Sequence, residues 1–354
     1  MATATLEPIS TSDVPRRPRG IARHWGRYRL FVRRLFFYII AAWAALTLNF
    51  LIPRAMPGNE VQSIMSKFPN LQPSAYKAIA AMLGVGHAGS LWHQYETYLV
   101  DVIHFNFGTD VMEYPAKVST LIAESLPWTL VLVGTATVIA FVVGTTFGII
   151  AGWNPGGWFD RSLPALMFLQ AIPYFFLALV LIYLFAAHVH VFPESAGYGE
   201  GLVPGLSVAF IASAIYHSLL PALTIVLTTM AGWLLQMRNV MLTTAGEDYV
   251  LAAQAKGLSQ RRVIFTYAAR NAILPQLQGF GLALGFVVSG AIVMEIVFSY
   301  PGIGLLLFNA VTSHDYPLMQ AIFLIITFAV LLANLVVDFV IMIIDPRARA
   351  SEGW

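Results

Sequence analysis

The sequence contains no cysteine, and only 11% of its 354 residues are charged. Without cysteine the chain forms neither disulfides nor thiolate metal sites. Soluble domains carry about 25% charged residues, so this chain has too few charges to cover the surface of a soluble globule of its length. A formal net charge of +2 gives no basis for nucleic-acid binding either.

Two kinds of functional signature are also missing. No G-x-x-x-x-G-K-[ST] segment occurs, so the chain itself cannot hold the phosphates of ATP in a P-loop. No arrangement of nucleophile and base is evident. His188 and His190 do not share a helix face at their spacing, and we expect no metal there. The sequence therefore predicts a non-catalytic chain with no cofactor of its own.

Hydrophobic residues, in contrast, make up 58% of the chain. A membrane-spanning helix needs about 20 mostly apolar residues, and six segments meet that requirement. We therefore predict an all-α polytopic membrane protein with six transmembrane helices. The predicted spans are Leu35–Ile52, Leu126–Ala151, Ser162–Ala187, Ser213–Met237, Asn271–Met294 and Tyr316–Val337.

The fourth span lies in a stretch of 37 uncharged residues between Glu200 and Arg238. As one continuous helix this stretch would be about 55 Å long, too long for a single crossing. Pro204-Gly205 and Pro221 are expected to divide it, which leaves an interfacial piece before the span.

Lysine and arginine indicate the orientation, because cytoplasmic loops carry an excess of both. Sixteen of the 20 fall on one side of the six-span arrangement, and the other four lie in the long segment 53–124. Both termini are therefore expected in the cytoplasm. The sixteen are Arg16, Arg17, Arg19, Arg23, Arg27, Arg29, Arg33, Arg34, Arg161, Arg238, Lys256, Arg261, Arg262, Arg270, Arg347 and Arg349.

These boundaries divide the chain into five regions. Residues 1–28 form a basic cytoplasmic extension without regular structure, and residues 346–354 form a cytoplasmic tail. Residues 29–53 are the first transmembrane helix, and 54–120 an extracytoplasmic loop region. Residues 121–345 form a five-helix core with one long cytoplasmic loop at 239–275.

That cytoplasmic loop is rich in helix signals. Thr244 and Glu247 have the spacing of a capping box, and the helix that follows is expected to end at Gly257. Ser259 begins a second helix that stops at Pro275. Ala252 and Ala253 would give the first helix a smooth surface for another protein. The alternative is a helical hairpin lying on the bilayer surface.

Glycines recur at four-residue spacing within two predicted spans, at Gly144, Gly148 and Gly152 and again at Gly281 and Gly285. Small residues at this spacing allow helix backbones to approach closely in a membrane. We expect packed-core or subunit contacts there.

Residues 247–259, Glu-Asp-Tyr-Val-Leu-Ala-Ala-Gln-Ala-Lys-Gly-Leu-Ser, followed by 270–275, Arg-Asn-Ala-Ile-Leu-Pro, resemble the EAA loop of binding-protein-dependent ABC importer permeases. The eighteen-residue step from Gly257 to Pro275 is similar to the dipeptide/oligopeptide branch. Further segments similar to that branch follow in order: 55–58 (Ala-Met-Pro-Gly), 172–175 (Ile-Pro-Tyr-Phe), 192–198 (Phe-Pro-Glu-Ser-Ala-Gly-Tyr), 295–304 (Glu-Ile-Val-Phe-Ser-Tyr-Pro-Gly-Ile-Gly), 315–317 (Asp-Tyr-Pro) and 345–349 (Asp-Pro-Arg-Ala-Arg).

The resemblance implies the type I ABC importer permease architecture in a cell membrane. It implies a second homologous permease subunit, two cytoplasmic ATPase subunits that bind ATP and Mg²⁺, and an extracytoplasmic substrate-binding protein. An outer loop would be supported by Glu295, Pro301, Gly302 and Gly304. The ATPase-coupling residues would be Glu247, Asp248, Tyr249, Ala252, Ala253, Ala255, Lys256, Gly257, Leu258, Arg270, Asn271 and Pro275.

The resemblance favours short peptides as the substrate. Oligosaccharides remain an alternative, because in this family selectivity is expected to reside mainly in the binding protein. A more distant alternative is a secondary transporter that couples to protons through Glu124, Glu295 or Asp338. Such transporters usually contain internal repeats, and the sequence shows no convincing one.

The charge distribution predicts on which side of the membrane a reporter fused after each loop will be active. Fusions after Gly157 and Ser259 are expected to show cytoplasmic activity, and fusions after Gly89 and Gly197 external activity, because positive loops stay inside. Alkaline phosphatase and fluorescent protein fusions measure this directly. A cytoplasmic signal at Gly89 would contradict the six-span arrangement.

Overall fold

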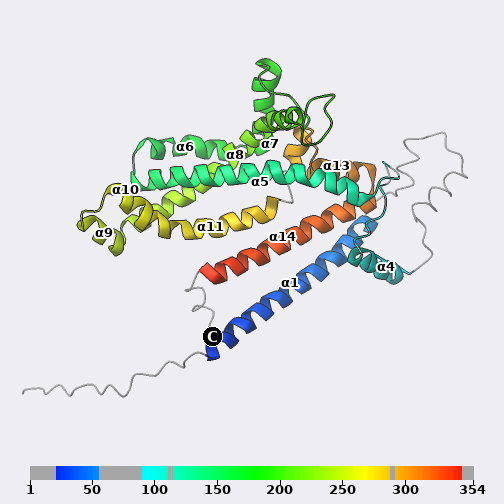
Figure 1. The fold of residues 1–354 in the computed structure, drawn as a ribbon, viewed down its shortest axis with the longest axis horizontal. Coiled ribbons are helices and arrows are strands. Elements are labelled where there is room, and N and C mark those ends of the chain that lie inside the picture. Colours follow the sequence, from blue (N-terminus) through cyan, green and yellow to red (C-terminus); the bar gives the residue numbers. More distant parts are fainter. Residues whose placement is uncertain (1–20, 56–89, 111–112, 114, 288–291, 345–354) are drawn as a thin grey trace, which may run out of the picture. The chain divides into compact units, whose positions relative to one another are not determined.

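The computed structural model describes residues 21–55, 90–110, 113, 115–287 and 292–344. Contacts divide the chain into two units, Met1–Ala44 and Ala45–Trp354. Helices dominate the described residues, and Thr109 and Lys117 form an isolated bridge. The helices (Figure 1) are α1 (Ile21–Ala55), α4 (Leu91–Ile103), α5 (Val118–Trp153), α6 (Trp158–Ala171), α7 (Tyr174–Leu181), the π-helix η2 (Ile182–His188), α8 (Val208–Ala245), α9 (Asp248–Ala255), α10 (Gln260–Arg262), the π-helix η3 (Val263–Ala268), α11 (Ala269–Phe286), α12 (Ile292–Val297), α13 (Ile303–Ser313) and α14 (Tyr316–Ile344).

Four helical segments among the described residues are long and apolar enough to cross a membrane, and a bent helix pair raises the number to five. These segments coincide with the predicted first, second, fourth and sixth spans. The all-helical, multi-span class is therefore confirmed, whereas the full count of six is not reached. The four are Leu35–Ala55, Val118–Trp153, Val208–Ala245 and Tyr316–Val336.

The predicted third span is not a single helix. It is divided into α6 and the α7–η2 pair, which meet at an angle of 96°. The break falls at Ile172 and Pro173, where Ile172 is extended with a ψ of 127°. Proline lacks an N–H and disfavours the helical conformation in the residue before it. The sequence Ile172-Pro173 therefore ends α6 and starts α7.

Pro221 does not divide the fourth span, contrary to the sequence prediction. α8 is one helix of 38 residues that contains Pro221. Leu220 and Pro221 are both buried, so the helix is surrounded by other protein at the proline. Transmembrane helices tolerate proline where surrounding protein supports the freed backbone. The piece expected before the span is an irregular segment that ends at Ser207, the N-cap of α8.

The predicted fifth span also differs in the structure. α11 ends at Phe286, and α12 begins at Ile292, with residues 288–291 outside the described part of the chain. The predicted stop at Pro275 is wrong, because Pro275 lies inside α11. Arg270, Asn271 and two glutamines make α11 less apolar than the four spans above.

The basic N-terminal extension is helical in its last part, because α1 begins at Ile21 rather than after residue 28. Its earlier residues, and the predicted tail at 346–354, lie outside the described residues. Within the predicted external loop region, α4 forms a helix whose N-cap Ser90 accepts the His93 N–H at 3.3 Å.

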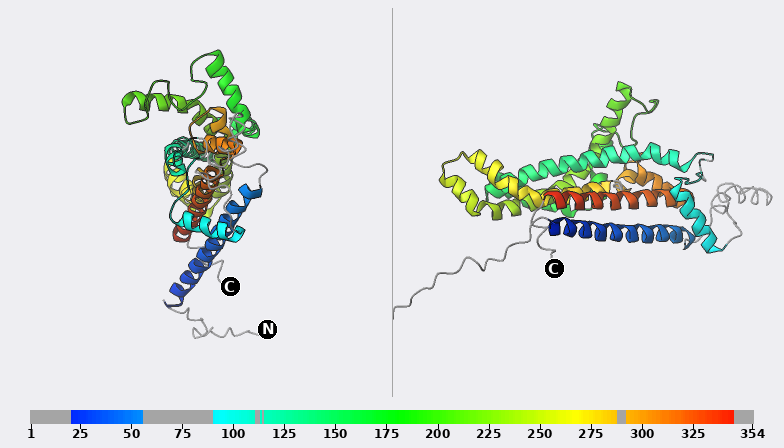
Figure 2. Two further views of the ribbon diagram at one scale, coloured as in Figure 1. Left: turned by 90° about the vertical axis from the view of Figure 1, so that its right-hand side faces the viewer. Right: turned by 60° about the horizontal axis from the view of Figure 1, so that its bottom comes forward.

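α5 and α8 form the closest helix pair. A Cβ at Gly144, Gly148 or Gly152 would lie 2.5–2.8 Å from atoms of α8. Backbone oxygens of α8 therefore touch α5 at successive turns, as the four-residue glycine spacing predicts. Gly285 in α11 has a similar role, since its Cβ would lie 2.7 Å from Ala333 of α14. α14 meets the first part of α5 where both pack against α13, and α11 lies along α14 (Figures 1 and 2).

Buried apolar residues gather in three clusters along these helices. One cluster joins α5, α8, α9 and η3 at the end of α5 near Ile149. A second joins the first part of α5 to α13 and α14. The third lies among α5, α7, α8 and α12. The α9 segment and α13 therefore lie at opposite ends of α5 (Figure 1).

The glycine contact yields a stability prediction. Gly148→Ala is expected to destabilise the protein by about 1–3 kcal/mol, because overpacking forces the helices apart. The added Cβ would lie 2.6 Å from Leu234 O and from Met237 Cβ. Gly134→Ala in the same helix is the matched control, since its nearest neighbour would be Val287 Cγ1 at 3.7 Å. Thermal unfolding in detergent measures both, and equal melting temperatures would contradict the close contact.

Candidate coupling site

The segment predicted to couple the chain to a partner follows directly from α8. α8 ends at Ala245, Gly246 caps it, and α9 begins at Asp248 with Glu247 as N-cap. Asp248 lies in the first turn of α9, where a negative charge is favourable. After α9 the chain turns at Gly257, and Ser259 is the N-cap of the next helix. The two-helix arrangement predicted from the sequence is confirmed.

The predicted capping box is wrong. Thr244 is still inside α8, and its hydroxyl donates to Val240 O at 2.8 Å. Glu247 has the extended backbone of an N-cap, but its side chain makes no cap hydrogen bond. α9 therefore begins three residues later than the Thr-x-x-Glu spacing indicated, at Asp248 instead of Ala245. Once Thr244 lies in a helix, its hydroxyl bonds to the preceding turn instead of a following N–H.

Gly257 closes α9 with two backbone hydrogen bonds. Its N–H donates to Gln254 O at 2.9 Å, and the Leu258 N–H donates to Ala253 O at 3.4 Å. This is the Schellman pattern, in which the residue after the C-cap adopts a left-handed conformation. Gly257 has a φ of +74°, a conformation that costs glycine little. The expected role of Gly257 as the end of this helix is confirmed.

α9 is anchored by one apolar face. Val250 and Ala253 are buried in the cluster that also contains Met237, Met241 and Val263. Ala253 is only 3% exposed, so the prediction that its methyl lies on a surface open to another protein is wrong. The helix turns Ala253 inward together with Val250, because residues three apart share a face.

The opposite face of α9 is open. Leu251 is 49% exposed and Tyr249 is 39% exposed. Glu247, Asp248, Ala252, Ala255 and Lys256 are exposed as well, while Leu258 is half-buried at the turn. Of the remaining predicted coupling residues, Arg270, Asn271 and Pro275 lie further along, on exposed positions of α11, and the Asn271 amide donates to Tyr267 O. The structure therefore gathers residues 247–258 into one feature and leaves these three on the following helix.

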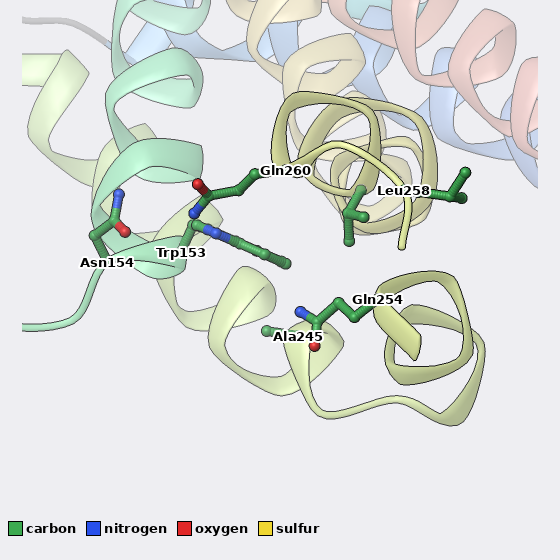
Figure 3. A pocket seen from close by; sticks show the side chains of 7 residues that line it. Trp153, Asn154, Ala245, Gln254, Leu258 and Gln260 are labelled. Atoms are coloured by element: carbon green, nitrogen blue, oxygen red, sulfur yellow. The ribbon is translucent and has the colours of Figure 1, made fainter. Parts of the chain in front are cut away.

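An open cavity of about 480 Å³ lies beside α9. Figure 3 shows side chains from the end of α5, the end of α8 and both sides of the Gly257 turn around it. Its lining has no charged side chain, and side-chain amides supply most of its polar groups. The lining residues are Trp153, Asn154, Ala245, Gln254, Leu258, Gln260 and Val263.

At the far end of α5, a buried carboxylate supports the start of α13. Glu295 is fully buried. Its Oε1 accepts the Thr129 hydroxyl at 2.7 Å, and its Oε2 accepts the Gly304 N–H at 2.6 Å. Thr129 Oγ1 in turn accepts the Ile303 N–H at 2.8 Å. Donors at the first turn of a helix have no partner within the helix, so Glu295 and Thr129 together satisfy them.

The two glycines of this region leave room for the carboxylate. A Cβ at Gly304 would lie 2.9 Å from Glu295 Oε2, and one at Gly302 would overlap the carboxylate itself. Pro301 packs against the segment between η2 and α8, since a Cβ at Gly197 would lie 2.6 Å from the Cδ of Pro301. Glu295 was expected to support a loop over Ser299–Asp315; the structure confirms the support, but most of that segment is the helix α13.

Sequence reasoning missed the partners of these groups. Thr129 was not singled out, although a hydroxyl within an apolar helix near Glu295 was an available signal. An ion pair between Asp160 and Arg238 was also missed. Its signal was the presence of opposite charges in two loops assigned to the same side of the membrane.

These features define a class of protein: a helical membrane subunit that crosses the bilayer several times and presents a short exposed helix at one end of its helix bundle. The described residues contain no group of three or more metal-ligating side chains.

Comparison with known proteins identifies the family within that class. Residues 144–350 match the family described as the binding-protein-dependent transport system inner membrane component. The chain is 30% identical to the oligopeptide transport system permease protein AppB of Bacillus subtilis, covering 89% of this chain and 98% of the relative. It is 30% identical to the dipeptide transport system permease protein DppB of Escherichia coli, covering 91% and 99%. A putative peptide permease protein of Brucella suis is 32% identical, covering 91% and 99%.

The chain therefore belongs to the family of binding-protein-dependent transport system inner membrane components, as the resemblance of its sequence motifs indicated. It is a non-catalytic, multi-pass inner-membrane subunit of an ABC transporter. Membership implies ATPase and binding-protein partners in general, and ATP is bound by the ATPase subunits.

The Gly257 turn gives a prediction about local stability. Gly257→Ala is expected to cost about 1–2 kcal/mol, because a side chain disfavours a positive φ. No atom lies within 4 Å of the added Cβ, so the cost comes from the backbone alone. Gly246→Ala is the matched control, since Gly246 has a φ of −87° and its added Cβ would meet only Thr243 O at 3.7 Å. Hydrogen exchange of the α9 amides measures the difference. Equal exchange in both variants would contradict the left-handed cap.

Proposed function

We propose that the chain forms part of the translocation pathway of an ATP-driven importer for short peptides delivered by an extracytoplasmic binding protein. The observation that carries this proposal is the exposed face of α9, held on the end of α8 by a buried face and a glycine turn. The named relatives support peptides as the substrate, since they are described as oligopeptide, dipeptide and peptide permeases.

The working assembly in this proposal has five subunits. A second homologous permease completes the pathway, two ATPase subunits lie on the cytoplasmic side, and one binding protein docks outside. A single chain of this kind exposes many large apolar side chains along its helices, which suits contacts with lipid and with a second permease.

The proposed topology has six crossings with both termini in the cytoplasm. The five crossings that the described helices allow are joined by a sixth, the span predicted over Asn271–Met294, to which α11 belongs. α11 packs along α14 and α8, as a helix within the bundle would. Positive charge on the side that carries α9 supports the cytoplasmic placement of that end.

Coupling would occur where α9 meets an ATPase. Asp248, Tyr249, Ala252 and Lys256 are exposed on α9, while Val250 and Ala253 fix the helix to α8 and η3. When ATP binding brings the two ATPases together, α9 is expected to move as one body with α8, because its buried face fixes it to that helix. Coupling requires an element with two arrangements that a partner biases, and α9 with α8 is the proposed element.

We propose that the shape of the outer entrance is maintained by Glu295, Pro301, Gly302 and Gly304.

The hydrogen bonds of Glu295 also help to decide against the competing class, a proton-coupled transporter. Its Oε2 accepts the Gly304 N–H at the start of α13, and its Oε1 accepts the hydroxyl of Thr129, which itself accepts the Ile303 N–H. A carboxylate engaged in this way serves the fold, and this favours the structural role over a proton relay.

The substrate is tested on the cognate binding protein by calorimetric titration with a short-peptide pool and with cello- and xylo-oligosaccharides. We expect heat from peptides alone. Uptake into proteoliposomes that contain the complete importer should then require ATP and the binding protein. Binding of sugars alone would overturn the peptide assignment, and ATP-independent uptake driven by a proton gradient would overturn the importer.

The coupling surface is tested by Ala252→Trp. Because Ala252 is exposed, the larger side chain should leave the fold intact and obstruct ATPase docking, so that ATP-driven uptake falls by at least about ten-fold, a loss of about 1.4 kcal/mol. Ala209→Trp, at an exposed position on the other end of α8, is the control and should retain uptake. Normal uptake with Ala252→Trp would show that this face does not contact the ATPase.

A further inference from the structure

An ion pair connects two helices at the α9 end of the bundle. Arg238 Nε of α8 lies 2.5 Å from Asp160 Oδ1 of α6. The side chains are only 23% and 14% exposed, respectively. Exposed ion pairs contribute little because water and salt screen them, whereas a pair shielded to this degree resists separation more strongly.

Asp160 also fixes the turn between α5 and α6. Its second oxygen, Oδ2, accepts the Gly156 N–H at 2.7 Å. Gly156 has a φ of +76°, so the turn takes a shape that disfavours other residues. One carboxylate therefore holds the turn, the first turn of α6 and α8 at a single point.

Arg238 contacts α6 through its side chain and belongs to α8, the helix that leads to α9. Its backbone lies against α5, since a Cβ at Gly152 would be 2.7 Å from Arg238 O. Its guanidinium also donates to Asn239 Oδ1 at 3.3 Å. The last residue of α8, Ala245, lies two helical turns further on, and α9 follows. A displacement of α9 therefore reaches Arg238 through a short, continuous length of helix.

α6 is held to α8 at its other end as well. The Gln170 amide lies against Gly232, where a Cβ would be 3.1 Å from its Nε2. Just beyond Gln170 the chain breaks by 96° and continues as α7. α7 packs against α12, the helix that carries Glu295. The break therefore separates a part held to the coupling end from a part held to the outer end.

From this geometry we propose that the Asp160–Arg238 ion pair is a positioning contact of the transport cycle. It makes α6 move together with the coupling end of α8, and so relays the movement of the ATPases to the break at Ile172 and Pro173. The proposal rests on the coupling role of α9 proposed above. Asp160 and Arg238 act through the helices they join and need not touch the substrate.

The first test uses the complete importer in proteoliposomes. Asp160→Asn and Arg238→Gln are expected to retain ATP hydrolysis while the number of peptides imported per ATP falls at least about five-fold, the lower end of typical coupling effects. Arg238→Lys keeps the charge and should retain most of the coupling. Arg161→Gln is the matched control, because Arg161 is exposed, is next in sequence, and has no ion-pair partner among the residues described.

Two results would overturn the proposal. One is a normal number of peptides per ATP in both neutral variants. The other is a parallel loss of hydrolysis, import and melting temperature that Arg238→Lys does not restore, since that pattern indicates a merely structural pair.

The second test does not depend on the transported substrate. Because the chain has no cysteine, spin labels can be attached to single cysteines that replace exposed Trp158 in α6 and exposed Thr243 in α8. In the complex with the ATPases, their separation is expected to stay constant when ATP binds. With Asp160→Asn the separation should change or broaden with ATP. An unchanged separation in that variant overturns the proposal, even if the wild-type importer transports a solute other than peptides.

Discussion

The close approach of α5 and α8 is the constraint on which the rest of the structure depends. Lipid gives no hydrophobic driving force between helices, so association relies on contact area and close backbone approach. Gly144, Gly148 and Gly152 place the backbone of α8 where a larger residue of α5 would put its Cβ. α8 then carries α9 at one end, and α5 supplies Thr129 to the support of α13 at the other. Both ends of the protein are built on this one pair.

Backbone chemistry sets the points where helices turn. Gly257 and Gly156 both have a positive φ, and each lets the chain reverse without strain at the same end of the bundle. Pro173 produces a break of a different kind, within a segment that would otherwise cross as one helix. α6, the first part of the broken segment, is joined to α8 of the closely packed α5–α8 pair by the contact between Asp160 and Arg238.

The buried polar groups around Glu295 follow the rule that buried donors and acceptors are paired. Glu295 and Thr129 meet the need of the first turn of α13, and Gly302 and Gly304 leave space for them. This arrangement makes the α13 end a closely packed unit, whereas the α9 end presents an exposed helix and an open cavity whose lining includes three side-chain amides. Under the proposed function, this exposed helix is the element that contacts the partner ATPases.

The sequence by itself determined the features that depend on composition and on local backbone preference. Those were the helical membrane class, four of the spans, the glycine contact and the turn at Gly257. The family followed from its ordered motifs. Tertiary structure decided what became of the three prolines: Pro221 and Pro275 lie within continuous helices, whereas Pro173 breaks one. At the buried Pro221 the physical reason is that surrounding protein supports the backbone that a proline frees.

At the candidate site, too, the sequence predicted the local features but not those that depend on tertiary packing. The sequence indicated that residues 247–258 form a helix and a turn, because caps and glycine conformation are local. It did not show that Ala253 faces inward, that Thr244 still belongs to α8, or that Asp160 meets Arg238 across 78 positions. Each of these depends on how α5, α6 and α8 lie against one another. Which face of a helix is buried, and which charges pair, is decided only when distant segments pack together.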